Sequence, residues 1–460
     1  MSNMLNETGL IVIVNALLYC KVLKHKFVSD DFTVWKNPPP VKNGWHKAWL
    51  RFIGAAKFQS PCPRILRYNG KWVLAIIKTE WLEHLIALLI HIAICVSIYF
   101  AFGATRSAFI AALLYSTNPV NNQGTIWPGG RGYALPILSL MLAMAVPILS
   151  PVLLYFCSWF TIGFFAPLAL IGSSRWYLLG LMPVIWFLHS RKYTTAIKLK
   201  QKTETFDEDK KMNFNKVIVF FKTYGFYLVL CVFPFRITFY HNFLQSMAGN
   251  EIMKKRAHSM DRYFWVGLLS WFGTLIFASL HWGPLAWAFL AFLIAILPFC
   301  NVVRANQEIA ERFACMPNVF LMFGLAQVIS PYNVIVTAFI VFYATRAWWT
   351  VGLYRDEYWI TEMAVIEDPH AWWAWHCRAM KRWDTQSYKE ALILWVMAKL
   401  ISPKEFKILM NIASCLRLLG NSKEADEYLA LAEANIIAGQ EVEAANYIAE
   451  HRRGKLPILL

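Results

Sequence analysis

The sequence predicts an all-α, polytopic membrane protein that carries a soluble helical-repeat tail. Three observations predict this fold class. Hydrophobic residues make up 58% of the 460 residues and charged residues only 16%, whereas soluble domains carry about 25% charged residues. The apolar residues are gathered in long runs. The segment after residue 356 instead repeats with a period of 34 residues.

The first domain, residues 1–356, is predicted to be a transmembrane bundle of about 11 spans. Several runs are shorter than the ~20 residues that a full crossing needs. The first run is followed by no small-residue cleavage site and is therefore expected to be a retained anchor. The runs are roughly 8–23, 82–103, 106–118, 132–148, 151–171, 175–189, 217–234, 263–282, 284–300, 317–330 and 332–349.

The polar loops between these runs set the expected orientation. Residues 190–216 carry eight Lys and Arg residues, which predicts a cytoplasmic position. If that loop follows six spans, parity places the N-terminus inside and the loop 24–81 outside. The loops 235–262 and 301–316 and the tail then also face outside. One signal disagrees, because the first run is preceded by no Lys or Arg and followed by three lysines.

The net charge of +17 lies mainly in the loops between apolar runs. That position favours anionic lipid or a lipid-linked phosphate as the partner, rather than nucleic acid. The nine cysteines form no CxxC pair, and most lie inside apolar runs. They are therefore interpreted as core residues and not as metal ligands or a disulfide framework.

The second domain, residues 357–460, is predicted to be a helical tail on the outer side. Ala364, Ala398 and Ala432 are spaced by 34 residues, as are Pro369 and Pro403. This is the period of the tetratricopeptide helix–turn–helix repeat. Small residues let paired helices approach closely, and proline ends a helix. Chance spacing of alanines is the alternative, but several positions share the one period.

Two adjacent aspartates, Asp30 and Asp31, follow the first apolar run in a chain with few acidic residues. A carboxylate at the edge of a bilayer can take a proton from a hydroxyl or hold a polar substrate. Neighbours in an extended segment point to opposite sides, so only one of them is expected to be a base, and we favour Asp31. In the structural alternative, Ser29 or Asp30 caps a short interfacial helix.

Three further polar segments fall on the same side by parity, and each holds an arginine that could bind a phosphate. The segment 118–131 interrupts apolar sequence, and such backbone is tolerated at membrane depth only where it is buried in protein or lines a cavity. The alternatives are a snorkelling arginine, an aromatic belt and a surface Glu–Arg pair. The arginines are Arg131, Arg236 and Arg312, and the supporting candidates are His84, Asn121, Gln123, Tyr240, His241 and Glu311.

His84 and His91 lie seven residues apart, on one helix face. No third ligand stands at suitable spacing, so a metal site is not expected and His91 is interpreted as an interior histidine.

In this order, the segments resemble the membrane-embedded GT-C glycosyltransferases, specifically the transmembrane tetratricopeptide-repeat O-mannosyltransferases and their bacterial relatives. The resemblance covers roughly residues 9–453. The family motifs are Phe-Val-x-Asp-Asp with Lys-Asn-Pro, His-Pro-Val-His-Thr-Glu-Ala-Val-Ala-Trp-x-x-Gly-Arg, Val-Ala-Glu-Arg-Tyr-x-x-x-Pro and Trp-Arg-Asp-Glu. They are similar to residues 27–31 with 36–38, 118–131, 309–317 and 354–357.

The chain also departs from the family pattern. Asn118 and Asn121 stand where the family has two histidines, and Gln123 stands where it has a glutamate. Ala87 replaces the asparagine between the paired histidines of the second run. A second acidic group that the family places near the site is therefore expected to be missing.

The resemblance implies transfer of a sugar from a polyprenyl-phosphate carrier to an acceptor hydroxyl at the outer membrane face, with inversion. Asp31, or Asp30, would act as the base. Arg312 and Arg131, and then Arg236, would stabilise the leaving phosphate. No cofactor or divalent cation is required, and the repeats would bind a glycan or protein acceptor.

The short loops and the compact tail favour a bacterial or phage-encoded enzyme that acts at the periplasmic side of the inner membrane. Its acceptor would be a surface glycan such as the O-antigen of lipopolysaccharide, whereas a eukaryotic relative would lie in the endoplasmic reticulum membrane and act on secreted proteins. The rival hypothesis is a non-catalytic scaffold or lipid-linked-sugar transporter that docks partners through its repeats. The Asn and Gln replacements favour that rival slightly.

Overall fold

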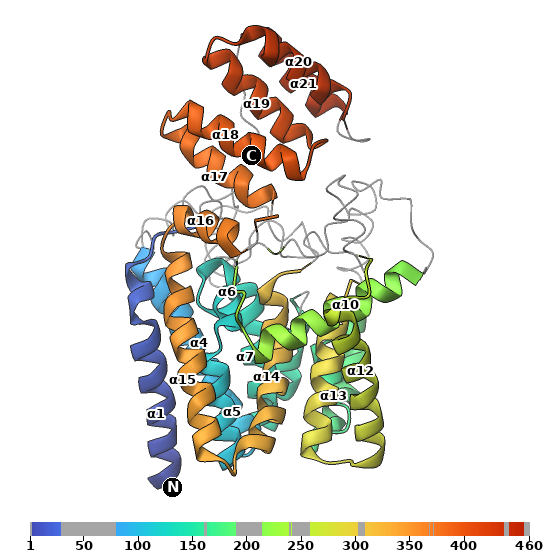
Figure 1. Ribbon diagram of the computed structural model, residues 1–460. Coiled ribbons are helices and arrows are strands. Elements are labelled where there is room, and N and C mark those ends of the chain that lie inside the picture. The colour runs from blue at the N-terminus through green and yellow to red at the C-terminus, as the bar shows by residue number, and fades with distance from the viewer. Residues whose placement is uncertain are drawn as a thin grey trace.

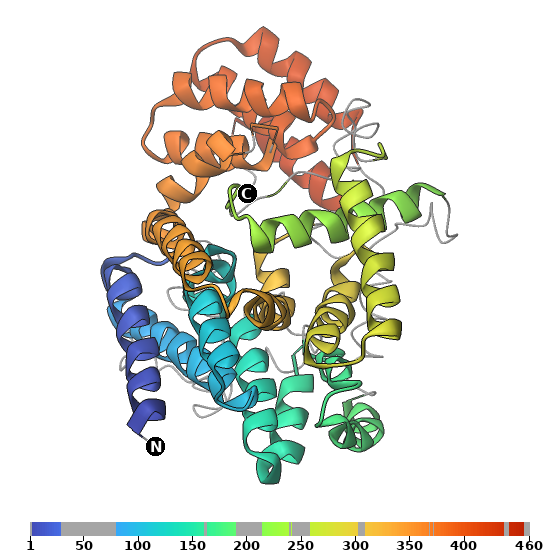
Figure 2. The ribbon, with the colours of Figure 1, turned by 60° about the horizontal axis from the view of Figure 1, so that its bottom comes forward.

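The computed structural model describes residues 2–28, 80–160, 163–189, 214–238, 241, 258–301, 309–367, 369–370, 372–436 and 441–454. All regular secondary structure in these ranges is helical, as the sequence predicts. The helices form a bundle and a tail, and the tail lies beyond the end of the bundle opposite the N-terminus (Figures 1 and 2). That end of the bundle is here termed the tail-side end.

The longer bundle helices follow the predicted runs. They are α1 (Ser2–Tyr19), α4 (Glu80–Ala101), α5 (Arg106–Thr117), α7 (Arg131–Ala145), α8 (Ser150–Ser158), α10 (Phe214–Val232), α12 (Arg262–Leu280), α13 (Pro284–Ile296), α14 (Glu311–Ile329) and α15 (Asn333–Thr350). Short helical turns lie between them: η1 (Cys20–Lys24), η3 (Pro119–Asn121), α6 (Asn122–Thr125), η4 (Pro128–Gly130), η5 (Pro147–Leu149), η6 (Ala166–Leu170), η7 (Trp176–Leu181), η8 (Leu297–Phe299) and η9 (Val351–Arg355).

Six helices in the described ranges are long and apolar enough to cross a membrane: α1, α4, α10, α12, α14 and α15, the first and last of them extended by η1 and η9. Three shorter apolar helices accompany them, Pro147–Ser158, Trp176–His189 and Pro284–Phe299. The runs at 106–118 and 132–148 form α5 and α7, of 12 and 15 residues. Helices therefore occur at the predicted runs, but the number of about 11 crossings stays a prediction.

Exposed tryptophan and tyrosine side chains lie near both ends of α12 and α15. Trp265, Trp348 and Trp349 lie near the tail-side ends of α12 and α15, whereas Trp282 and Tyr332 lie at the opposite ends. Along either helix the two levels are about 25 Å apart at 1.5 Å per residue, close to the ~30 Å hydrocarbon core of a bilayer. Such belts are typical of membrane interfaces, so their spacing fits a bilayer around the bundle.

Helix α10 runs obliquely across the tail-side end, whereas α12, α14 and α15 follow the long axis of the bundle (Figure 1). It crosses α12 where Gly225 meets Gly267. A Cβ on Gly225 would lie 2.0 Å from the carbonyl oxygen of Tyr263, and one on Gly267 would lie 1.9 Å from that of Phe221. By parity, α10 would carry the chain from one side of the membrane to the other. This orientation does not support that step, and the side of residues 190–216 stays a prediction.

The tail repeats one helix pair. Its helices are α16 (Glu357–Glu367), α17 (Trp372–Asp384), α18 (Tyr388–Ile401), α19 (Phe406–Leu418), α20 (Ser422–Glu433) and α21 (Glu441–Arg452). The first residues of α17 and α19 are 34 apart (406 − 372), as are those of α18 and α20 (422 − 388). Gln386 and Gly420, also 34 apart, both have positive φ, 60° and 88°. The predicted period is thus a repeated helix pair, and its tetratricopeptide identity stays a prediction.

Helix α16 fixes the tail to the bundle. Its residues Ile360 and Met363 belong to the main hydrophobic core of the bundle. Arg378 of α17 pairs with Glu362 of α16 at 2.8 Å. The tail is therefore attached at the end of the bundle where the polar segments lie.

Candidate functional site

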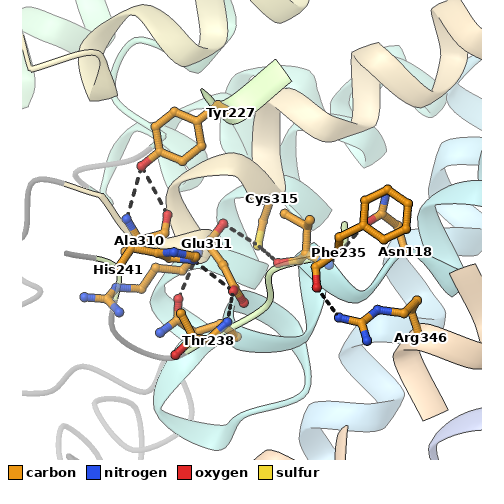
Figure 3. Close-up of polar contacts among 12 residues, drawn as sticks. Asn118, Tyr227, Phe235, Thr238, His241, Ala310, Glu311, Cys315 and Arg346 are labelled. Carbon is orange, nitrogen blue, oxygen red and sulfur yellow. Dashed lines mark hydrogen bonds and ion pairs between the residues drawn. The ribbon is translucent and has the colours of Figure 1, made fainter. Parts of the chain in front are cut away.

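Two of the polar segments selected from the sequence contact the start of α14, and Figure 3 shows the contacts of the chain after α10 with it. Gln123 of α6 contacts the backbone of Arg312, and His241 contacts the carboxylate of Glu311. The start of the first segment is also close to the bundle end, because the Phe27 amide donates to Glu80 Oε1 at 3.4 Å. The predicted site residues Asp30, Asp31 and Tyr240 lie outside the described residues.

Three consecutive residues, Ala310 to Arg312, are held by several other segments. The hydroxyl of Tyr227 in α10 donates to the Ala310 carbonyl at 3.3 Å and accepts from the Ala310 amide at 3.1 Å. The Arg312 amide donates to Gln123 Oε1 at 3.1 Å. The Arg312 side chain donates from Nε to the hydroxyl of Tyr133 in α7, also at 3.1 Å. These bonds fix the backbone and the side chain of Arg312 from different directions.

Glu311, the first residue of α14, is fully buried. Its Oε1 accepts from the Thr238 amide at 2.6 Å and from His241 Nε2 at 3.1 Å (Figure 3). The start of a helix favours a carboxylate electrostatically, and a buried carboxylate needs such donors to offset its lost hydration. Glu311 therefore ties the residues after α10 to the start of α14.

The guanidinium of Arg312 lies against aromatic rings. Its Cζ is 5.5 Å from the centre of the Tyr133 ring and 5.4 Å from that of Phe313. Phe313 in turn stacks on Phe299, with 5.0 Å between centroids. Aromatic faces attract a guanidinium, and a guanidinium so oriented can present parallel N–H donors to a phosphate. Arg312 is half-buried, so it is the site arginine best suited to bind an anion.

Arg131 forms a buried ion pair with Glu83 of α4. Each side chain is 1% exposed, and Arg131 Nη2 lies 2.6 Å from Glu83 Oε2. The same Nη2 donates to the Glu83 carbonyl at 2.7 Å. This ion pair joins α4 to α7. Because its guanidinium already binds a buried carboxylate, Arg131 is less suited than Arg312 to bind a lipid phosphate. The phosphate role of Arg131 stays a prediction, as does that of Arg236, whose side chain is exposed.

Asn118 and Asn121 stabilise irregular backbone. Asn118 Nδ2 donates to the Cys231 carbonyl at 2.7 Å. Asn121 Nδ2 donates to the Tyr115 carbonyl at 2.7 Å, and its Oδ1 accepts from Asn318 at 3.1 Å. An amide cannot serve as a proton-accepting base. These contacts fit the expectation that the segment 118–131 is buried in protein rather than facing lipid.

The two histidines of α4 are both buried but have different neighbours. His84 is buried next to His25, with 5.9 Å between their ring centroids. Burial, and then the neighbouring His84, lower the pKa of His25 to about 3. His91 is an interior histidine as predicted, with Nε2 3.4 Å from the Ser116 carbonyl. No cluster of three His, Cys, Asp or Glu suited to a metal occurs in the described ranges.

Glu83, Tyr133 and Tyr227 were not among the residues predicted from the sequence. A signal for Glu83 was available, because an acidic residue inside an apolar run needs a partner and Arg131 was already a candidate. The two tyrosines lie within or beside apolar runs, where they cannot be told from core aromatics. Comparison with protein-family models, curated proteins and solved structures gives no match. The site must therefore be interpreted from its own geometry.

Proposed function

We propose that the protein is a membrane glycosyltransferase that moves a sugar from a polyprenyl phosphate to an acceptor hydroxyl. The observation that carries the proposal is Arg312, an arginine fixed at the tail-side end of an apolar helical bundle. A polyprenyl chain would lie in lipid beside the outward apolar faces. Its phosphate would then lie at the interface, which is the level of Trp348 and Trp349 and of the site.

In the proposed reaction, a carboxylate takes the proton of the acceptor hydroxyl as its oxygen attacks the anomeric carbon. Asp31 is the favoured base, and Asp30 positions the acceptor or the loop. The bond from the anomeric carbon to the phosphate oxygen breaks, and its electron pair leaves with the phosphate. Arg312 stabilises that negative charge, and a single displacement inverts the configuration at the sugar.

We also propose the finer features that the family resemblance implies. The bundle would be of the GT-C type with about 11 crossings, and the tail would be a tetratricopeptide-type domain that binds the acceptor. The site and tail would face the periplasm of a bacterium, and the acceptor would be a surface glycan. The attachment of the tail at the site end of the bundle supports a role in presenting the acceptor.

Mass spectrometry of surface glycans and proteins, with and without this gene, tests the proposal. A hexose-sized addition that depends on the gene is expected. Asp31→Asn and Asp30→Asn, expressed at normal levels, then test the base. Asp31→Asn should abolish the addition, and an unchanged addition would remove Asp31 from that role. No gene-dependent addition on any surface molecule would contradict the function itself.

One observation favours a second candidate, a non-catalytic scaffold or lipid-linked-sugar transporter. Asn118 and Asn121 occupy the positions of family histidines, and both are engaged in structural hydrogen bonds. A scaffold would keep its cellular phenotype after Asp31→Asn and Arg312→Ala together, whereas an enzyme would lose it. Complementation of a deletion strain with that double variant separates the two functions.

A further inference from the structure

We propose that Glu311 is a positioning residue for the phosphate-binding arginine, acting through the chain that leaves α10. This role rests on the proposed function, since it requires Arg312 to bind the donor phosphate. Glu311 itself is fully buried and contacts Thr238 and His241. We assign it the task of holding the first turn of α14, and hence Arg312, in one orientation.

The chain after α10 is anchored at both of its described ends. At its start, the Tyr343 hydroxyl of α15 donates to the Val232 carbonyl at 2.8 Å. Arg346, one turn further along α15, donates to the Pro234 carbonyl at 3.2 Å and to that of Phe235 (Figure 3). At its other end, Glu311 is the acceptor. The carboxylate thus completes a connection from α15, through the chain after α10, to α14.

The chemistry of Glu311 suits this role better than that of a neutral residue. One oxygen accepts two donors, a backbone amide and a ring nitrogen. When Glu311 is ionised its carboxylate only accepts, and Nε2 of His241 then carries the donated proton. Charge-assisted bonds of this kind are about twice as strong as neutral ones. Loss of the carboxylate would leave the Thr238 amide and His241 buried without that acceptor.

The effect reaches Arg312 because the two residues are neighbours in the first turn of α14. Successive helical side chains point about 100° apart at 3.6 residues per turn, so Glu311 faces the chain after α10 while Arg312 reaches Tyr133 of α7. Release of the turn on the Glu311 side would move the Arg312 side chain. A displacement of about 1 Å at a reacting group can cost on the order of 100-fold in rate.

The start of α12 offers a matched control. Asp261 is also a carboxylate at a helix start at the tail-side end of the bundle. It accepts from the amides of Tyr263 and Phe264 at 3.0 and 3.3 Å and pairs with Lys222 at 2.7 Å. These contacts join α12 to itself and to α10, and none involves Arg312. Asp261→Asn therefore makes the same change of charge as Glu311→Gln without touching the proposed connection.

The test uses the full chain in lipid nanodiscs and two readouts. Hydrogen exchange of a peptide that contains the Thr238 amide reports the connection itself. Binding of farnesyl phosphate, a polyprenyl phosphate without a sugar, reports the phosphate site. Glu311→Ala should raise the exchange rate of that peptide tenfold or more and weaken farnesyl phosphate binding about tenfold. Glu311→Gln keeps an acceptor oxygen and should give smaller changes of the same sign.

The controls separate this role from the proposed function. Asp261→Asn should leave both readouts within twofold of the wild type. Arg312→Ala should abolish binding and leave the exchange rate unchanged. If Glu311→Ala and Glu311→Gln leave the exchange or the binding at wild-type values while Arg312→Ala abolishes binding, the positioning role is wrong and the phosphate site stands. If Arg312→Ala binds normally, the proposed function loses its phosphate site and this role falls with it.

Discussion

Helices α12 and α14 begin with the same pattern, an acidic residue, an arginine and an aromatic residue, yet the two starts differ in what they contact. In α12, Asp261 caps its own helix through the amides of Tyr263 and Phe264. Arg262 is exposed and lies over the Tyr263 ring, with its Cζ 4.9 Å from the ring centre. Apart from the pair of Asp261 with Lys222 of α10, these contacts are local.

In α14, the same residue types make contacts across the fold. Glu311 reaches Thr238 and His241, and Arg312 reaches Gln123 and Tyr133. The difference follows from burial, because 83% of the most apolar stretch of α14 is buried in the protein, whereas only 17% of that of α12 is buried. A helix surrounded by other segments can build a site at its first turn, whereas α12, which is less buried, mainly caps itself.

The largest expected effect comes from breaking the buried ion pair between Arg131 of α7 and Glu83 of α4. Arg131→Met leaves the Glu83 carboxylate buried without its cation and should cost about 3–5 kcal/mol of unfolding free energy. Lys222→Met, its counterpart on the α12 side, leaves Asp261 30% exposed with its helix-cap bonds intact and should cost at most about 1 kcal/mol. Unfolding titrations in mixed detergent micelles measure both. Equal losses would contradict the contrast between the two sides.

The next largest loss of stability is expected from a substitution at the close crossing of α10 and α12. Gly267→Ala places a Cβ 1.9 Å from the Phe221 carbonyl oxygen and should cost about 1–3 kcal/mol through overpacking. Gly273→Ala is the matched control on the same helix, because its Cβ meets no atom within 4 Å. That substitution should stabilise the helix by about 0.5–1 kcal/mol. A Gly267→Ala variant as stable as Gly273→Ala would show that the helices do not cross there.

The smallest expected effect is a pH dependence on the side of the bundle where α4 meets the site. Burial and the neighbouring His84 lower the pKa of His25 to about 3 in the folded protein, whereas an unfolded histidine has a pKa of about 6.5. Below pH 6.5 the unfolded state therefore binds a proton that the folded state does not, and stability falls as the pH falls towards about 3. From pH 7 to 5.5, His25 alone should account for a loss of about 1 kcal/mol.

His25→Gln removes this titration while keeping a polar side chain of similar size. The variant should therefore lose about 1 kcal/mol less than the wild type over that pH interval, measured by the same unfolding titration. An identical pH dependence in the two proteins would show that His25 is accessible to protons in the folded state.

Much of the architecture could be predicted because it depends on local patterns. The apolar runs predict the bundle helices, and the 34-residue spacing of Ala398 and Ala432, both fully buried, follows from the same repetition as the helix pairs of the tail. The candidates Gln123, His241, Glu311 and Arg312 do lie together. Each was selected as a polar residue in or beside apolar sequence, where a side chain needs a polar partner.

The rest depends on contacts between distant residues. No local sequence pattern predicts that Glu83 pairs with Arg131, 48 residues away. Nor does one predict that Glu311 accepts a hydrogen bond from the backbone amide of Thr238. The orientation of α10 was also unpredictable, because its composition indicates a span, whereas its close crossing with α12 joins Gly225 to Gly267, 42 residues further along the chain. For the same reason the sequence could not tell the start of α14 from that of α12.

The most direct measurement compares the two helix-start arginines in one reaction. Arg312→Ala and Arg262→Ala would each be purified, reconstituted in nanodiscs and assayed for release of polyprenyl phosphate from polyprenyl-phosphate sugars in the presence of acceptor glycan. We expect Arg312→Ala to lower turnover at least about 100-fold, the loss typical of one stabilising donor in a transition state, and Arg262→Ala to stay within twofold of the wild type. Equal turnover by the two variants would contradict the account.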